Sequence, residues 1–89
     1  MIVSVDLMKQ GYAVFRSLSP SCECDLIRMR DGKMERVEVT AGTLMKEGRL
    51  TWAKHDRSRY DVLAVYLKDG NVYYFHTEAE EAEMARKGR

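Results

Sequence analysis

The sequence predicts a small α/β domain, bordering on α+β, with a mixed central sheet of four to six strands between a short N-terminal helix and a C-terminal helix. Its 89 residues are 45% hydrophobic and 33% charged, which is typical of one globular domain spanning residues 1–89. Short segments rich in β-branched and aromatic residues alternate with glycine turns, as strands do. Helical signals occur at the two ends of the chain.

The opening segment, residues 2–10, fits two structures. Ile2, Val5 and Met8 recur at helical spacing, and Gly11 is a suitable helix end. Val3 and Val5 fit a strand equally well. We favour the helix.

Six candidate strands follow, over residues 13–18, 24–30, 34–41, 49–54, 61–68 and 71–76. Two Asp-Gly pairs separate neighbouring candidates and predict two-residue hairpin turns. In the second hairpin, that turn at Asp69-Gly70 predicts that Tyr66 faces Tyr73 in a cross-strand packing pair. The last helix is expected over 77–87, because Thr77 is a good N-cap and Glu80 completes a capping box.

Composition narrows the class of protein. No apolar run approaches the ~20 residues that span a bilayer, and the first ten residues lack the basic start of a signal peptide, so we expect a cytoplasmic (intracellular) protein without a membrane partner. Within a strand, Cys22 and Cys24 would project from the same face too far apart for a relaxed disulfide. Two thiols are also too few for a zinc site, and we expect reduced thiols. A chain this short has a thin stability margin, which a homodimer interface would widen.

The first hairpin carries the most informative pattern. An Asp31-Gly32 turn of type I′ pairs Arg30 with Lys33, and the same register places Asp25 directly opposite Glu38 on one face of the sheet. Facing carboxylates repel each other, and a divalent cation would remove the repulsion. The residues alone leave a second interpretation open, in which both are solvated surface acids paired with Arg36 or Arg16. A register slip of one residue would separate them.

The spacing of Asp25 and the run Glu38-Val39-Thr40 resembles the signature of PD-(D/E)XK nucleases, especially the small group I intron-associated endonucleases and the Holliday-junction-resolvase-like domains. Four segments carry the resemblance, with the sequences QGYAVFR (10–16), CDLI (24–27), RVEV (36–39) and RYDVLAVY (59–66). The resemblance implies a minimal restriction-endonuclease-like core and metal-dependent hydrolysis of DNA phosphodiester bonds.

In that family, the resemblance implies, Mg²⁺ (or Mn²⁺ in its place) is held by two acids and the carbonyl group between the last two motif positions, here Asp25, Glu38 and Val39. The metal polarises the phosphate and lowers the pKa of the attacking water. The family's lysine, two residues after the second acid, is here Thr40, which has no charge and is no base near neutral pH. Lys54 and Lys46 are the candidate replacements, and we select Lys54.

The candidate DNA contacts are basic residues that suit phosphate binding: Arg16, Lys54, Arg57 and Arg59. The predicted catalytic set is Asp25, Glu38, Thr40 and Lys54. Two alternatives stay open beside the endonuclease. One is a catalytically inactive relative that binds nucleic acid or protein, and the other is a small assembly protein in which the sheet is only an interface.

Overall fold

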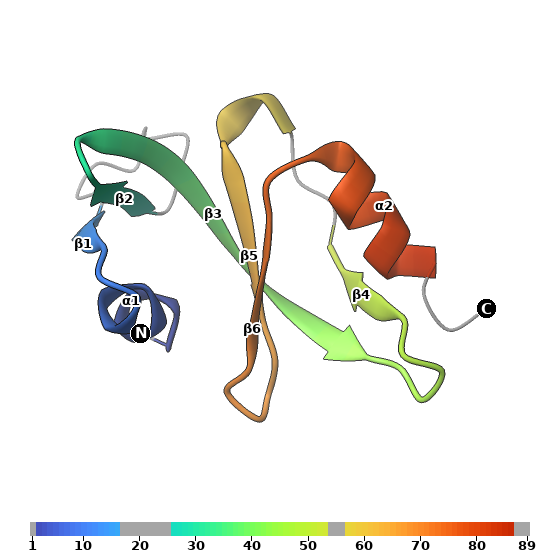
Figure 1. Ribbon diagram of the computed structural model, residues 1–89. Helices are drawn as coiled ribbons and strands as arrows, with labels where there is room; N and C mark the ends of the chain where they lie inside the picture. Colours follow the sequence, from blue (N-terminus) through green and yellow to red (C-terminus); the bar gives the residue numbers. More distant parts are fainter. Residues whose placement is uncertain (1, 17–25, 54–56, 87–89) are drawn as a thin grey trace.

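The computed structural model describes residues 2–16, 26–53 and 57–86. It confirms the predicted fold class, a mixed sheet with a helix at each end of the chain (Figure 1). In chain order the elements are α1 (Ile2–Lys9), β1 (Ala13–Arg16), β2 (Leu26–Arg30), β3 (Lys33–Leu44), β4 (Leu50–Trp52), the 3₁₀ helix η1 (Arg57–Arg59), β5 (Val62–Tyr66), β6 (Val72–Phe75) and α2 (Glu78–Arg86).

The main sheet has the strand order β1-β2-β3-β5-β6. All neighbours in it are antiparallel except β3 and β5, which run parallel with Val37 beside Val62. The far end of β3 continues past the main sheet and pairs with β4. Figure 1 shows this strand crossing the molecule, with α1 near its first half and α2 near its second.

Each face of the sheet has its own core cluster. The α1 side buries residues of α1, β2, β3 and β5: Val3, Leu7, Leu26, Val37, Val62 and Ala64. The α2 side buries residues of β4, β5 and β6 and the segments beside β5: Leu50, Tyr60, Leu63, Val65, Leu67 and Phe75. On the α2 side Trp52 stacks on Phe75 with ring centroids 5.4 Å apart. Because side chains alternate along a strand, each position on β3 belongs to one of these two environments.

Helix α1 confirms the preferred reading of the opening segment. The Gly11 amide donates to the Met8 carbonyl at 3.1 Å, and a positive φ of 89° at Gly11 ends the helix. The buried residues are Val3 and Leu7. The stripe used to predict the helix, Ile2, Val5 and Met8, lies on the exposed side.

The guanidinium of Arg28 connects β2 to neighbouring segments on the α1 side of the sheet. Arg28 is buried, and its Nη2 lies 2.9 Å from the Glu35 carboxylate and 3.0 Å from Nε2 of His76. Its guanidinium also lies over the Tyr12 ring, 4.4 Å from the centroid. A buried cation needs such partners to offset its lost hydration, so this group ties β2 to β3 and to the end of β6.

The prediction that Tyr66 faces Tyr73 is wrong. Tyr66 pairs with Val72, and Tyr73 pairs with Val65. The connection is a three-residue loop, in which the Leu67 amide donates to the Asn71 carbonyl and only Gly70 has positive φ. A type I′ turn needs positive φ at both central residues, whereas this loop needs it at one. The resulting shift of one residue puts the two tyrosines on opposite faces.

The other predicted elements form, but their bounds differ slightly: β5 covers 62–66 where 61–68 is predicted, and β4 covers 50–52 where 49–54 is predicted. The largest difference at one end is an extension. β3 runs three residues beyond the predicted 34–41, through Gly42 to Leu44. The α2 capping box is confirmed, since the Glu80 amide donates to Thr77 Oγ1 and the Thr77 amide to Glu80 Oε1, both at 3.1 Å. No described helix is long and apolar enough to cross a membrane. Cys22 and Cys24 lie outside the described residues.

Candidate active site

Strand β3 presents two of the predicted catalytic residues, Glu38 and Thr40, on one face together with Arg36. Val37 and Val39 pack in the α1-side cluster, so the alternate residues Arg36, Glu38 and Thr40 project to the α2 side. Glu38 lies beside Leu63 of β5, and Thr40 lies beside Val65. Glu38 is half-buried and Thr40 is buried. The candidate site therefore starts from a half-buried carboxylate on the α2 side of the sheet.

The β2–β3 hairpin has the predicted turn and the predicted register. Asp31 and Gly32 have φ values of 54° and 79°, as a type I′ turn requires. Arg30 pairs with Lys33, and the pairing continues without a bulge to Leu26 and Val37. Asp25 is the next residue before Leu26 and lies outside the described residues. The described part of the hairpin thus ends one position short of the predicted acidic pair.

The Val39 carbonyl has a defined direction. The Arg36 carbonyl accepts a hydrogen bond from the Asp61 amide at 2.9 Å, so it points toward β5. Carbonyl groups alternate in direction along a strand. The Val39 carbonyl, three residues later, therefore points toward the β2 side of β3.

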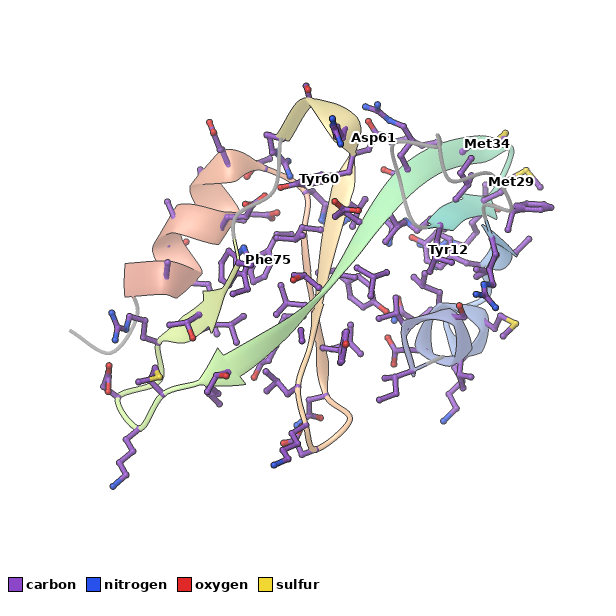
Figure 2. All side chains as sticks on the ribbon, turned by 180° about the vertical axis from the view of Figure 1, so that it is seen from behind. Tyr12, Met29, Met34, Tyr60, Asp61 and Phe75 are labelled. Atoms are coloured by element: carbon purple, nitrogen blue, oxygen red, sulfur yellow. The ribbon has the colours of Figure 1, made fainter. Side chains whose placement is uncertain are left out.

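An ion pair adjoins Glu38 on the same face. Arg36 donates from Nε to Asp61 Oδ2 and from Nη2 to Asp61 Oδ1, both at 3.2 Å, and its backbone amide donates to Oδ2 at 2.8 Å. The hydrogen bond from the Arg36 side chain is the main reason why the pKa of Asp61 is lowered. Asp61 stands at the start of β5 (Figure 2), where the parallel pairing with β3 begins. The sequence places Arg36 two residues before Glu38, which predicts that the two share a face of the strand. It does not predict the contact of Arg36 with Asp61, which is expected only as the first residue of a strand.

The predicted DNA contacts are spread over different surfaces. Arg57 donates to Glu81 and to the His76 carbonyl, each at 2.6 Å, and lies over the Tyr60 ring, so it joins η1 to α2. Arg59 ends η1 on the exposed surface just before Tyr60. Arg16 shares its face of β1 with Val14, on the α1 side, and so projects away from the Glu38 face. Lys54 lies outside the described residues.

Tyr60 lies on the α2 side of the sheet. Its ring is buried between β5 and α2 (Figure 2), and its hydroxyl is 3.4 Å from Glu81. Burial raises the pKa of the Tyr60 hydroxyl. Across the ranges 2–16, 26–53 and 57–86, three or more Cys, His, Asp or Glu side chains nowhere gather into a cluster. Of the predicted metal ligands, the described residues are Glu38 and Val39.

Comparisons with known proteins bear on the fold. No protein-family model matches the chain, and no curated protein matches it. Among solved structures, a bacterial homing endonuclease, I-Ssp6803I, is similar, with a TM-score of 0.68 and 14% sequence identity. The match covers 91% of this chain, and this chain spans 66% of the length of that one. At this level of identity the similarity shows a shared fold.

Proposed function

We propose that this chain is a metal-dependent DNA endonuclease of the PD-(D/E)XK type, which hydrolyses phosphodiester bonds with Asp25 and Glu38 as its acidic pair. The observation that carries the proposal is the β2–β3 register, which runs unbroken to Leu26 and Val37. One further step in that register, as the sequence predicts, would bring position 25 opposite position 38. Pairs with and without backbone hydrogen bonds alternate along an antiparallel hairpin, and the Arg30–Lys33 pair that closes the turn is a hydrogen-bonded one. The predicted 25–38 pair would therefore be of the kind without backbone hydrogen bonds, in which facing side chains are closest.

The shared fold supports the same proposal. The similar solved structure is, by its title, a homing endonuclease. Fold similarity alone does not carry an activity, because one fold hosts many functions. It adds weight here because the fold and the hairpin register point to the same type of site. DNA is then the proposed partner, and a homodimer remains a prediction.

The donor set suits Mg²⁺. Two carboxylates and a carbonyl group are hard oxygen ligands, which Mg²⁺ takes together with water and phosphate oxygens. Glu38 is half-buried on the α2 side, and the Val39 carbonyl points toward the β2 side of β3. Asp25, Glu38 and Val39 would hold the ion, which supplies polarisation of the phosphate and a lower pKa for the attacking water.

The site needs a group that takes or orients the proton of that water. Thr40 is buried in the sheet beside Val65 and has no base. In the sequence Lys54 lies between β4 and η1. Trp52 of β4 and Arg57 of η1 both lie on the α2 side, the side to which Glu38 projects. Lys54 therefore remains the proposed replacement for the family's lysine.

The test is nicking of supercoiled plasmid by the purified protein with Mg²⁺ or Mn²⁺, together with calorimetric titration of either metal. Asp25→Asn and Glu38→Gln should each abolish nicking and weaken metal binding. Glu83→Gln, which removes an exposed charge on α2, is the matched control and should change neither. Unchanged metal affinity in both site variants would rule out the assigned pair.

A second candidate is a catalytically silent relative that binds nucleic acid. The observation that favours it is the burial of Thr40, because the family's amine is missing from a closely packed position. This candidate predicts DNA binding that weakens steeply with salt and no cleavage with either metal. Nicking by the unaltered protein, lost in Glu38→Gln, would eliminate it.

A further inference from the structure

Arg36 is the described basic residue next to Glu38 along the same face of β3. Alternate residues of a strand are about 6.5–7 Å apart at Cα, so the two side chains leave the sheet as close neighbours. The side chains of Arg36 and Asp61 are 41% and 43% exposed. Arg36 is thus a partly exposed cation two residues before Glu38 on the same face of the strand.

The guanidinium is held from two sides. Asp61 binds Nε and Nη2, and the Ser58 carbonyl accepts from Nη1 at 3.2 Å. These contacts involve all three nitrogens of the guanidinium. They also fix the plane of the guanidinium before any ligand arrives, which lowers the entropy lost when a ligand binds.

The site that Glu38 belongs to requires a cation. A phosphodiester brought to a carboxylate carries a negative charge of its own, and a positive group is needed beyond the metal to hold it in place. Position 40, where the related nucleases carry a lysine, is here a buried threonine. Arginine suits phosphate because its planar fork matches two phosphate oxygens.

We propose that Arg36 is the phosphate-binding residue of this site and that Asp61 is the positioning residue that holds it there. This inference rests on the proposed function and names a contact that the family resemblance does not include. The ligand is the DNA backbone at or next to the bond that is cut. Asp61 acts through Arg36 alone.

A purely structural role for the pair makes a different prediction. The same bonds tie η1 and the start of β5 to β3, so loss of either partner would loosen the fold in the same direction. A phosphate-binding role predicts different effects on DNA affinity for the two residues. A neutral substitution of Arg36 removes a positive charge, whereas a neutral substitution of Asp61 removes a negative one. Variants of opposite charge therefore separate the two roles.

The experiment measures the Kd of a short DNA duplex in EDTA over a range of salt concentrations for Arg36→Gln, Arg36→Lys and Asp61→Asn, with thermal unfolding of each. Arg36→Gln should weaken binding about tenfold and reduce the slope of log K against log salt by about 0.9. Arg36→Lys should recover part of the affinity. Asp61→Asn loses the contact that positions the guanidinium, so it should weaken binding, but less than Arg36→Gln does. It should leave the salt slope unchanged, because the positive charge of Arg36 remains.

The matched control is Arg49→Gln, which removes another partly exposed, ion-paired arginine in the connection between β3 and β4. Affinity that falls alike in Arg36→Gln and Asp61→Asn, or an Arg36→Gln variant that binds like Arg49→Gln, would overturn the inference, as would absence of DNA binding by the unaltered protein. Binding that depends on Arg36 without any nicking would leave the inference standing and remove the proposed cleavage. A nicking rate that is unchanged in Arg36→Gln would overturn the inference and leave the proposed cleavage standing.

Discussion

Gly42 lies against Val65 so closely that a Cβ atom at position 42 would overlap the Cγ1 methyl of Val65. The same atom would stand 3.0 Å from the Thr51 carbonyl oxygen. Gly42 is the residue at which β3 leaves its pairing with β5 and begins to pair with β4. The absent side chain is what lets the two pairings meet over the α2-side cluster.

We therefore expect Gly42→Ala to destabilise the fold. The added methyl must displace the side chain of Val65 in a packed cluster, and overpacking of this kind costs about 1–3 kcal/mol. Chemical denaturation of the variant measures the loss. Gly42→Ala combined with Val65→Ala should recover part of it, and a single variant as stable as the unaltered protein would contradict the close approach.

The capping box of α2 makes a second prediction. Thr77→Ala removes the oxygen that accepts the Glu80 amide, and loss of such a cap costs about 1 kcal/mol. Thr77→Ser keeps the oxygen and should stay within a few tenths of the unaltered value. Unfolding monitored by circular dichroism compares the two, and equal losses would show that the hydroxyl contributes nothing.

The pKa of Asp61 predicts a pH dependence of stability. Its carboxyl has a lowered pKa in the folded protein, chiefly because of the hydrogen bond from the Arg36 side chain. A lowered folded pKa contributes stability that is present above the ordinary aspartate pKa of 3.8 and is lost as pH falls through the folded value. Asp61→Asn lacks this contribution at every pH. The difference in unfolding free energy between the unaltered protein and Asp61→Asn should thus be largest near neutral pH and shrink below pH 3.8. A constant difference would contradict the ion pair.

The missing amine at position 40 gives a fourth prediction, which depends on the proposed function. Thr40→Lys places an amine on the face of Glu38, two residues along the strand, and should raise the nicking rate with Mg²⁺ by about a hundredfold if it supplies general-base or positioning catalysis. Thr40→Met, of similar length without a charge, is the control for the volume added at this buried position. Equal rates in the lysine and methionine variants would show that the amine has no role.

The two Asp-Gly turns show how well the local sequence predicts the register of a hairpin. Asp31 and Gly32 both take positive φ, and the register of β2 against β3 followed from that turn alone. At Asp69-Gly70 only the glycine takes positive φ, and the hairpin shifted by one residue. The same dipeptide serves both loops, and the packing of the flanking strands on the two core clusters selects between them.

Helix α1 also combines a feature that the local sequence predicted with one that packing decided. Its existence and its end at Gly11 followed from spacing and from the glycine. Its buried side did not, because apolar residues occupy both sides of the helix, and the sheet covers Val3 and Leu7 while Ile2, Val5 and Met8 remain exposed.

The sequence by itself determined the local features of this protein: where the helices and strands lie, how α2 is capped, and the register of β2 against β3 from the Asp31-Gly32 turn to Leu26 and Val37. These depend on backbone preferences and hydrogen bonds within a few residues of each other. Only the tertiary structure decided that β5 runs parallel to β3 and that Asp61 binds Arg36, 25 residues away in the chain. Such a contact forms only after a long loop has closed and both core clusters have packed, and its energy is set by that packing rather than by any short stretch of sequence.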